Sequence, residues 1–196
     1  MTAAVHDIVV MTPLACSRVA AAAPPWVEAS LTRAPFAVVR RERRVGVICV
    51  GIRGATRSER FAADLDAREI ERRITPEELA ERSPARAHPV LSALAQAGAI
   101  ARAYKIGWGP AGAAAFELAT GLPVLSEESD LDLVLRLHPA DERVPVLARA
   151  FTTLCARVDA ELDFDDGCGT ALNEAAAPGR LLVKTALGPR LVSAWV

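Results

Sequence analysis

Two aspartates separated by a single leucine could hold a metal ion in this chain. Asp130 and Asp132 belong to the segment Ser-Asp-Leu-Asp-Leu-Val-Leu, residues 129–135, whose polar and apolar residues alternate as in a strand. Side chains along a strand point to opposite faces in turn, so both carboxylates share one face while the leucines enter the core. The two residues then stand about 6 to 7 Å apart, and their oxygens can share one or two magnesium ions. Because carboxylates flanked by leucine are costly unless they bind something, we favour metal binding over a plain exposed strand face.

A glycine-rich turn stands before this strand. Residues 107–121 predict that turn and a short helix after it. Backbone N–H groups at a helix start bind phosphate oxygens well. The turn and the two aspartates together indicate metal-assisted transfer of a phosphate-bearing group.

A third carboxylate is expected from a neighbouring strand. Residues 158–164 predict that strand, and Asp159, Glu161 and Asp163 alternate along it. Asp159 opens the strand and could merely cap it, and the other two compete with it for a role at the site. The residues by themselves leave this choice open.

Arginines at a second turn could bind phosphate. Apolar residues at 36–39 and 45–52 flank a basic cluster and predict a β-hairpin, which ends at Gly51-Ile52-Arg53-Gly54. Arg53 is held between two glycines, and arginines on turns are suited to reaching phosphate oxygens. Alternatively, Arg53, Arg57 and Arg60 pair with Glu59 or Asp64 on the surface.

The remaining pattern supplies the scaffold and a domain boundary. Thr75 and Pro76 begin a short helix, and Pro84 and Pro89 bracket the boundary, so we expect an N-terminal subdomain over residues 1–86 and a catalytic subdomain over residues 87–196. The further elements expected in the second subdomain are a helix from Pro89 that ends at Gly107, a helix over about 139–157, and a closing hairpin of 181–185 with 191–196 about Gly188-Pro189.

Composition narrows the class of protein. With 196 residues, 52% of them hydrophobic, the chain can bury a full core. No apolar run reaches the roughly 18 residues that span a bilayer, and no signal-peptide pattern opens the chain, so we expect a cytoplasmic protein with no membrane partner. A net charge of -1 argues against nucleic-acid binding.

The order of these elements resembles the nucleotidyltransferase superfamily of the DNA polymerase β type. In that superfamily a Gly-Ser turn precedes an Asp-x-Asp strand, and a third carboxylate comes from a neighbouring strand. More specifically, the chain is similar to the malonate decarboxylase holo-acyl-carrier-protein synthases, the phosphoribosyl-dephospho-CoA transferases. The matching blocks, in the family's order, are Gly51 to Arg60, Thr75 to Leu79, Trp108 to Gly121, Ser129 to Leu133, and Val158-Asp159.

The resemblance implies a fold and a reaction. The expected fold is α+β, with a polymerase-β-type nucleotidyltransferase subdomain, a mixed sheet with flanking helices, after a smaller α+β N-terminal subdomain. The expected reaction moves 2'-(5''-phosphoribosyl)-3'-dephospho-CoA from its triphosphate precursor to a serine of the decarboxylase's acyl carrier protein, and pyrophosphate leaves. The expected cofactor is Mg²⁺, and the expected partners are the triphosphoribosyl-dephospho-CoA donor and the carrier protein.

The resemblance also assigns roles to particular residues. Asp130 and Asp132 hold Mg²⁺, and Asp159 is preferred over Glu161 as the third carboxylate, which helps to deprotonate the acceptor serine. The residues assigned to the donor are Arg53, Arg57, Gly112, Ala113 and Ser129.

One departure from the family pattern lies at the glycine turn. Where the family has Gly-Ser-x-Gly, this chain has Gly112-Ala113-Ala114-Ala115, so the hydroxyl that would meet a phosphate is missing at Ala113. One lost neutral hydrogen bond typically costs about 0.5 to 1.5 kcal/mol, so a reduced rate is expected rather than none. Two alternatives therefore stay open: another nucleotidyltransferase acting on a protein, RNA or small molecule, and a catalytically impaired binding protein on the same scaffold.

Overall fold

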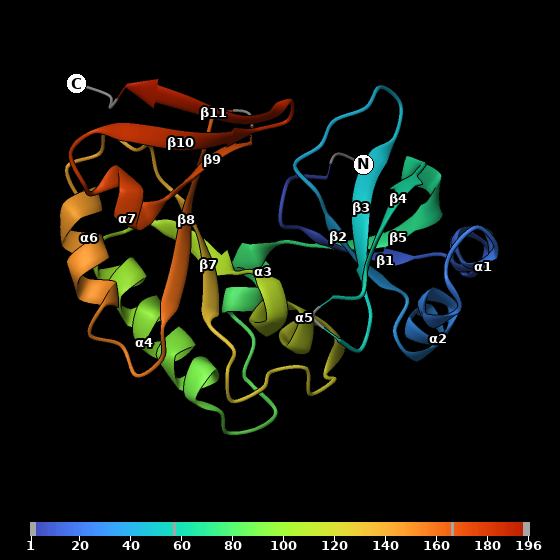
Figure 1. The fold of residues 1–196 in the computed structure, drawn as a ribbon. Coiled ribbons are helices and arrows are strands. Elements are labelled where there is room, and N and C mark those ends of the chain that lie inside the picture. The colour runs from blue at the N-terminus through green and yellow to red at the C-terminus, as the bar shows by residue number, and fades with distance from the viewer. Residues whose placement is uncertain (1–2, 57, 166, 194–196) are drawn as a thin grey trace. The chain divides into compact units, whose positions relative to one another are not determined.

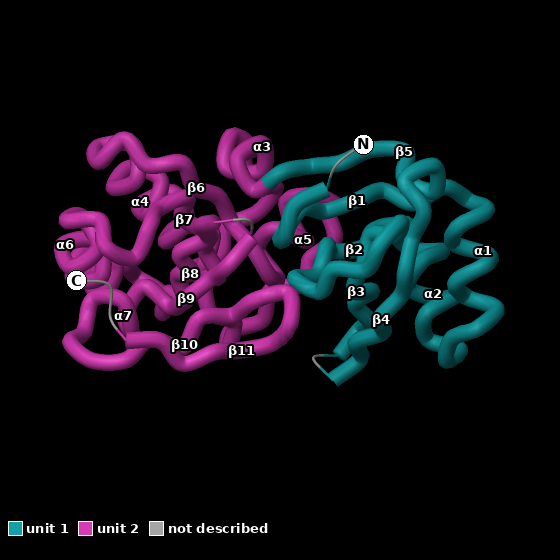
Figure 2. Tube along the Cα trace, turned by 90° about the horizontal axis from the view of Figure 1, so that it is seen from above, with its two compact units in different colours: residues 1–75 teal, residues 76–196 magenta. Residues whose placement is uncertain are grey.

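The chain folds into two compact α+β units. The computed structural model describes residues 3–56, 58–165 and 167–193. Residues 1–75 form the first unit and residues 76–196 the second (Figures 1 and 2). Each unit has its own sheet, so the expected α+β class is confirmed at this level.

The first unit is an antiparallel five-stranded sheet of order β4-β3-β2-β1-β5, on which two helices pack. Its elements are β1 (Ile8–Met11), α1 (Pro13–Ala21), α2 (Pro25–Arg33), β2 (Phe36–Val39), β3 (Ile48–Arg53), β4 (Arg60–Leu65), the 3₁₀ helix η1 (Ala67–Glu69) and β5 (Ile70–Ile74). The predicted hairpin is confirmed as β2 and β3, although β3 begins at Ile48 because Val45 and Gly46 lie in an exposed turn.

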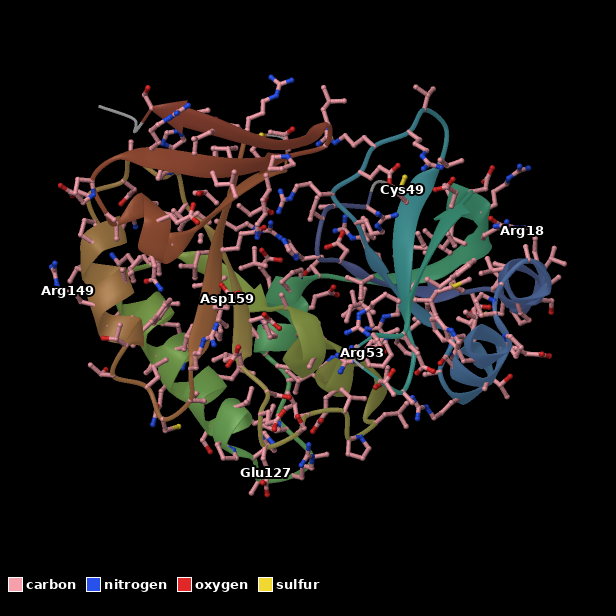
Figure 3. All side chains as sticks on the ribbon, viewed as in Figure 1. Arg18, Cys49, Arg53, Glu127, Arg149 and Asp159 are labelled. Carbon is pink, nitrogen blue, oxygen red and sulfur yellow. The ribbon has the colours of Figure 1, made fainter. Side chains whose placement is uncertain are left out.

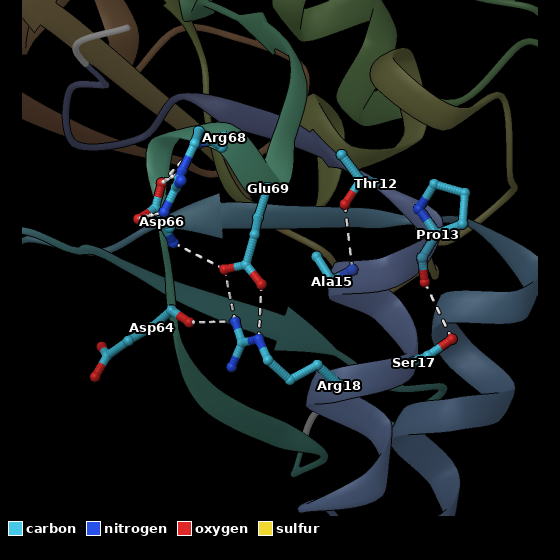
Figure 4. A network of polar contacts seen from close by, with 9 residues as sticks. All are labelled: Thr12, Pro13, Ala15, Ser17, Arg18, Asp64, Asp66, Arg68 and Glu69. Atoms are coloured by element: carbon cyan, nitrogen blue, oxygen red, sulfur yellow. Dashed lines mark hydrogen bonds and ion pairs between the residues drawn. The ribbon is translucent and has the colours of Figure 1, made fainter.

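A polar network ties α1 to the turn between β4 and β5 (Figure 4). Thr12 caps α1 by accepting a 3.2 Å hydrogen bond from the Ala15 N–H. Arg18 donates two hydrogen bonds of 2.6 and 2.7 Å to Glu69 and a third, of 2.9 Å, to the Asp64 carbonyl. These contacts join α1 to residues about 50 positions later in the sequence. The polar groups in them therefore have a structural role.

The second unit holds a six-stranded sheet of order β11-β10-β9-β8-β7-β6, in which only β7 and β8 run parallel among the described strands. Its elements are α3 (Pro76–Ala80), α4 (Pro89–Ala103), β6 (Gly107–Pro110), α5 (Gly112–Thr120), β7 (Leu131–Arg136), α6 (Val144–Phe151), β8 (Val158–Phe164), β9 (Cys168–Ala171), α7 (Leu172–Ala175), β10 (Arg180–Thr185) and β11 (Gly188–Ser193). Buried side chains of α4, α6 and α7 pack with those of β7 and β8 in one core, so these helices cover one face of the sheet.

Most predicted elements of this unit are present, with three changes of extent. The helix from Pro89 and the strand over 158–164 are confirmed, and the closing hairpin is confirmed as far as Ser193, since residues 194–196 lie outside the described residues. The second helix is shorter than expected, and β7 begins one residue after Asp130. Residues 107–110, expected as part of a turn, form the edge strand β6, which pairs with β7.

The structure divides the chain at Thr75/Pro76, whereas the sequence pattern placed the division after residue 86. Residues 76–86 pack within the second unit. A Cβ on Gly109 would lie 2.1 Å from the Pro76 carbonyl oxygen, so α3 lies directly on β6. Arg82 donates a 3.0 Å hydrogen bond to the Leu118 carbonyl near the end of α5. The prolines at 84 and 89 therefore bound a loop inside this unit.

Candidate functional site

The carboxylate face is our name for the face of the six-stranded sheet that bears Asp132 and Asp159. These two residues are direct partners in the parallel register of β7 and β8. Leu131, Leu133 and Leu135 are buried on the opposite face, as the alternation predicts, while Asp132 is half-buried and Asp159 is exposed. Neighbouring strands lie about 4.8 Å apart, so the sheet brings together aspartates that lie 27 residues apart in the sequence.

The start of α5 lies against the Asp132 carboxylate. The Ala111 N–H donates a 2.9 Å hydrogen bond to the Asp132 carbonyl, and Gly112 follows with φ of 55°. A Cβ on Gly112 would lie 1.8 Å from Asp132 Oδ2. Glycine is therefore required at position 112 for two reasons: its backbone angle, and the close approach of the Asp132 carboxylate. The glycine turn and the aspartate strand meet as one site, with a helix N-terminus beside a carboxylate.

Asp159 differs from its two competitors on β8. Glu161 forms an ion pair with Lys184, and the buried Asp163 forms one with Arg136. Arg136 also donates a 2.8 Å hydrogen bond to Glu77 of α3. Among the described residues, Asp159 makes no side-chain hydrogen bond or ion pair. This difference supports Asp159 as the third carboxylate, a role that stays a prediction.

Arg157 is a candidate that the sequence analysis missed. Its side chain is 78% exposed, and its Nε lies 3.7 Å from Asp130 Oδ2. The Leu131 N–H donates a 2.8 Å hydrogen bond to the Arg157 carbonyl, which fixes the backbone beside the start of β7. The sequence feature that could have identified Arg157 is its position directly before the second parallel strand. A guanidinium here is suited to phosphate oxygens.

The carboxylates suit Mg²⁺ only in combination with a ligand. Within the described ranges, no group of three or more His, Cys, Asp or Glu side chains is placed to hold a metal ion. Magnesium usually takes one or two carboxylates and completes its shell with water and substrate phosphates. Asp130 and Asp132, two residues apart at the start of β7, could supply that limited number of carboxylates, a role that stays a prediction.

The other predicted donor-binding residues are placed as follows. Ser129 takes part in a turn, where its hydroxyl accepts a 3.0 Å hydrogen bond from the Ser126 N–H. Arg53 ends β3 in the first unit, opposite Arg60 on β4, and Arg57 lies outside the described residues. Arg60 donates to the carbonyls of Thr56 and Glu59, at 3.3 and 3.0 Å. Donor contacts by these residues stay predictions.

Glu117 has a structural role in the loop that leads to β7. Its carboxylate accepts hydrogen bonds of 2.7 and 3.0 Å from Arg86, and of 2.8 and 2.9 Å from the Val124 and Leu125 amides. Burial by itself raises the pKa of Glu117, but the hydrogen bonds from Arg86 and the two amides outweigh it and hold the pKa below its ordinary value. Glu117 therefore connects α5 to the loop before Asp130.

Fold and site together define a two-unit α+β protein in which carboxylates of two parallel strands stand beside a helix N-terminus. Family models of phosphoribosyl-dephospho-CoA transferase MdcG match the chain twice, the N-terminal domain over residues 4–76 and the C-terminal domain over residues 77–194. The chain thus belongs to the phosphoribosyl-dephospho-CoA transferase family, as its sequence motifs predict. The boundary between the two domain models falls one residue from that between the compact units.

Curated relatives agree over nearly the whole chain. A protein of Pseudomonas syringae pv. tomato named phosphoribosyl-dephospho-CoA transferase is 40% identical over 194 residues, covering 96% of this chain and 90% of its own. Relatives of the same name are 39% identical in Azotobacter vinelandii (95% and 91% covered) and 37% identical in Klebsiella pneumoniae (87% and 86% covered). No solved structure matches the chain. No described helix is long and apolar enough to cross a membrane.

Proposed function

We propose that this protein transfers 2'-(5''-phosphoribosyl)-3'-dephospho-CoA from its triphosphate precursor to a serine of the malonate decarboxylase acyl carrier protein. Membership of the family supports the donor, because the curated relatives carry it in their name. The observation that carries the chemistry is the register of Asp132 opposite Asp159, with Gly112 against the Asp132 carboxylate. This arrangement is suited to in-line transfer of a phosphoryl-linked group.

The chain's own groups have distinct tasks in this reaction. The acceptor serine oxygen attacks the α-phosphorus of the donor, and its proton passes to the Asp159 carboxylate. The bond from the α-phosphorus to the oxygen that bridges to the β-phosphorus breaks, and pyrophosphate leaves. Gly112 and the Ala113 amide are proposed to hold the terminal phosphates at the start of α5. Arg157 adds positive charge at the same edge of the sheet.

Magnesium is proposed to bind at Asp130 and Asp132 together with the donor's phosphates. When bound, it neutralises charge that develops on the phosphoryl oxygens. Asp132 is suited to this role because the Ala111 contact holds its backbone and Gly112 leaves room at its carboxylate. Arg53 and Arg57 stay assigned to the donor's phosphates as predictions from the sequence.

Mass spectrometry of the acceptor tests the function. The purified protein is incubated with Mg²⁺, the triphosphoribosyl-dephospho-CoA donor and apo carrier protein, and we expect a mass gain on one serine with one pyrophosphate released per transfer. ATP as the donor should give no mass gain. Transfer of AMP instead would indicate another nucleotidyltransferase. Tight donor binding without any transfer would indicate an impaired binding protein.

Ala113→Ser should raise the transfer rate or tighten donor binding by up to about tenfold, the equivalent of one good hydrogen bond. Ala113 lies in the first turn of α5, directly after Gly112, and its methyl group is half-buried at the edge of the core. The initial rate and the donor Kd are compared between parent and variant. Ala114→Ser is the matched control because Ala114 is fully buried, and its hydroxyl should destabilise the fold without a gain in rate. A variant at 113 with unchanged rate and affinity would mean that this turn does not contact the phosphates.

A further inference from the structure

The hairpin of β10 and β11 presents an exposed surface that the proposed reaction does not yet use. In its register Leu182 lies opposite Leu191, and Lys184 lies opposite Pro189. Leu182 is 42% exposed and Leu191 is 50% exposed, whereas the alternating residues Leu181 and Val183 are buried. One side of the hairpin therefore packs inward and the other carries open apolar side chains. We name the outward residues the hairpin face: Arg180, Leu182, Lys184, Pro189 and Leu191.

The hairpin face and the carboxylate face are one side of one sheet. Lys184 on β10 is the register partner of Gly169 on β9, which in turn is the partner of Asp163 on β8. Directly paired residues of neighbouring strands point to the same side, and Asp159, Glu161 and Asp163 alternate on that side of β8. The Lys184–Glu161 ion pair confirms the direction of both side chains.

This geometry places the hairpin face close to the proposed chemistry. Strands are spaced about 4.8 Å apart, so β10 and β11 lie roughly 10 and 15 Å from β8, which carries Asp159. Figure 1 shows β10 and β11 side by side at the end of this sheet, beyond β9. A protein that rests on the hairpin could thus bring a loop of its own to the carboxylates.

Charge identifies the kind of partner that fits. Residues 177–193 contain three basic residues, Arg180, Lys184 and Arg190, and no acidic residue. The rest of this part of the chain, residues 87–176, holds 6 basic and 13 acidic residues. Arg180 lies on the hairpin face beside the exposed leucines and suits an acidic partner with an apolar centre, whereas Lys184 is paired with Glu161 and Arg190 lies on the opposite side of the hairpin.

We propose that the hairpin face is the docking surface for the protein that carries the acceptor serine, and that this partner binds with an acidic surface around an apolar side chain. The inference rests on the proposed function, in which the acceptor is a protein. Leucines 182 and 191 supply the apolar centre of the contact, and Arg180 supplies charge at its rim.

Binding is measured apart from transfer, so that the two proposals can fail separately. The probe is the apo carrier subunit with its acceptor serine replaced by Ala, titrated into the full chain by calorimetry. The double variant Leu182→Ser/Leu191→Ser should weaken this binding by roughly tenfold or more. Leu14→Ser, at an exposed leucine of α1, is the matched control and should leave the affinity unchanged. Donor binding with Mg²⁺ should be the same in all three proteins.

A second set of variants in the same binding experiment reverses a charge. Arg180→Glu should weaken carrier binding strongly at low salt and less at high salt, because screening reduces the repulsion it creates. Arg149→Glu is the control, since Arg149 is exposed on α6, which packs on the opposite face of the sheet; Figure 3 labels it together with Asp159. Thermal melts confirm that each variant is folded.

The outcomes separate the two proposals. The docking surface is overturned if the hairpin variants do not weaken carrier binding. It is also overturned if the control variants weaken carrier binding equally. Absence of carrier binding to the parent chain overturns it as well. Carrier binding that depends on the hairpin, without transfer from the donor, overturns the proposed function and leaves the docking surface in place. A parent dimer that the leucine changes convert to a monomer, seen by light scattering, would assign the face to self-association instead.

Discussion

Asp132→Asn is expected to reduce transfer by about 100-fold or more while the second unit stays folded. An amide cannot supply the negative charge that binds Mg²⁺, and a lost metal contact costs several kcal/mol in the transition state, at about 1.4 kcal/mol per tenfold in rate. Asp132 is half-buried beside Gly112, and it pairs in register with Asp159, so no other carboxylate on β7 can replace it. The measurements are the transfer rate by mass and the Mg²⁺ dependence of donor binding by calorimetry.

The control for this change is Glu127→Gln, another carboxylate-to-amide substitution in the same unit. Glu127 is exposed in the loop before β7, and Figure 3 shows its side chain labelled there. The variant should transfer at the parent rate. If Asp132→Asn also keeps the parent rate, the metal-carboxylate mechanism is wrong.

Gly112→Ala is expected to slow transfer by roughly 100-fold, because about 1 Å of misplacement at a reacting group can cost that much. The new Cβ would lie 1.8 Å from Asp132 Oδ2 and 2.6 Å from its Cγ, so the carboxylate or the start of α5 must move. The left-handed backbone at Gly112 adds strain of about 1 kcal/mol for a residue with a side chain.

Gly121→Ala separates the steric effect from the backbone strain. Gly121 ends the same helix with φ of 73°, but a Cβ added there would have nothing within 4 Å, so this variant meets strain alone. Gly112→Ala should lose more stability than Gly121→Ala in thermal melts because it also meets the clash with Asp132, and only Gly112→Ala should lose transfer. Equal loss of rate in both would mean that the contact with Asp132 is unimportant.

The departure at the glycine turn places alanines at two positions that differ in burial. Ala115 is buried in the second unit, three residues after Gly112 on α5. Ala113 is half-buried in the first turn of the helix. Ala113 is the position at which the family pattern has its serine, so the substitution test is made there.

Local patterns in the sequence were sufficient for several elements of the second unit. Alternating leucine and aspartate predicted β7 and its two faces, and helical spacing after Pro89 predicted α4. In both cases the residues that specify the element are neighbours in the sequence, so the period of the pattern carries the information. Motif order also predicted the family, which the comparisons confirmed.

Strands with charged or mixed residues were not predicted. β5 reads Ile-Glu-Arg-Arg-Ile, and β4 begins with the exposed Arg60, so neither shows a simple apolar alternation. Their pairing with β1 and β3 supplies the backbone hydrogen bonds that make them strands. Sheet partners distant in the sequence override a weak local preference.

The sequence by itself determined which residues are proposed to carry the chemistry, and tertiary structure decided which of them meet. Strand periodicity, a local property, predicted the face that Asp132 takes on β7, while Asp130 lies one residue before the strand. The partnership of Asp132 with Asp159, the pairing of Glu161 with Lys184, and the position of Arg157 beside Asp130 depend on the register between strands. Register is set by packing of the whole sheet against α4 and α6, and no short segment of the chain contains that information.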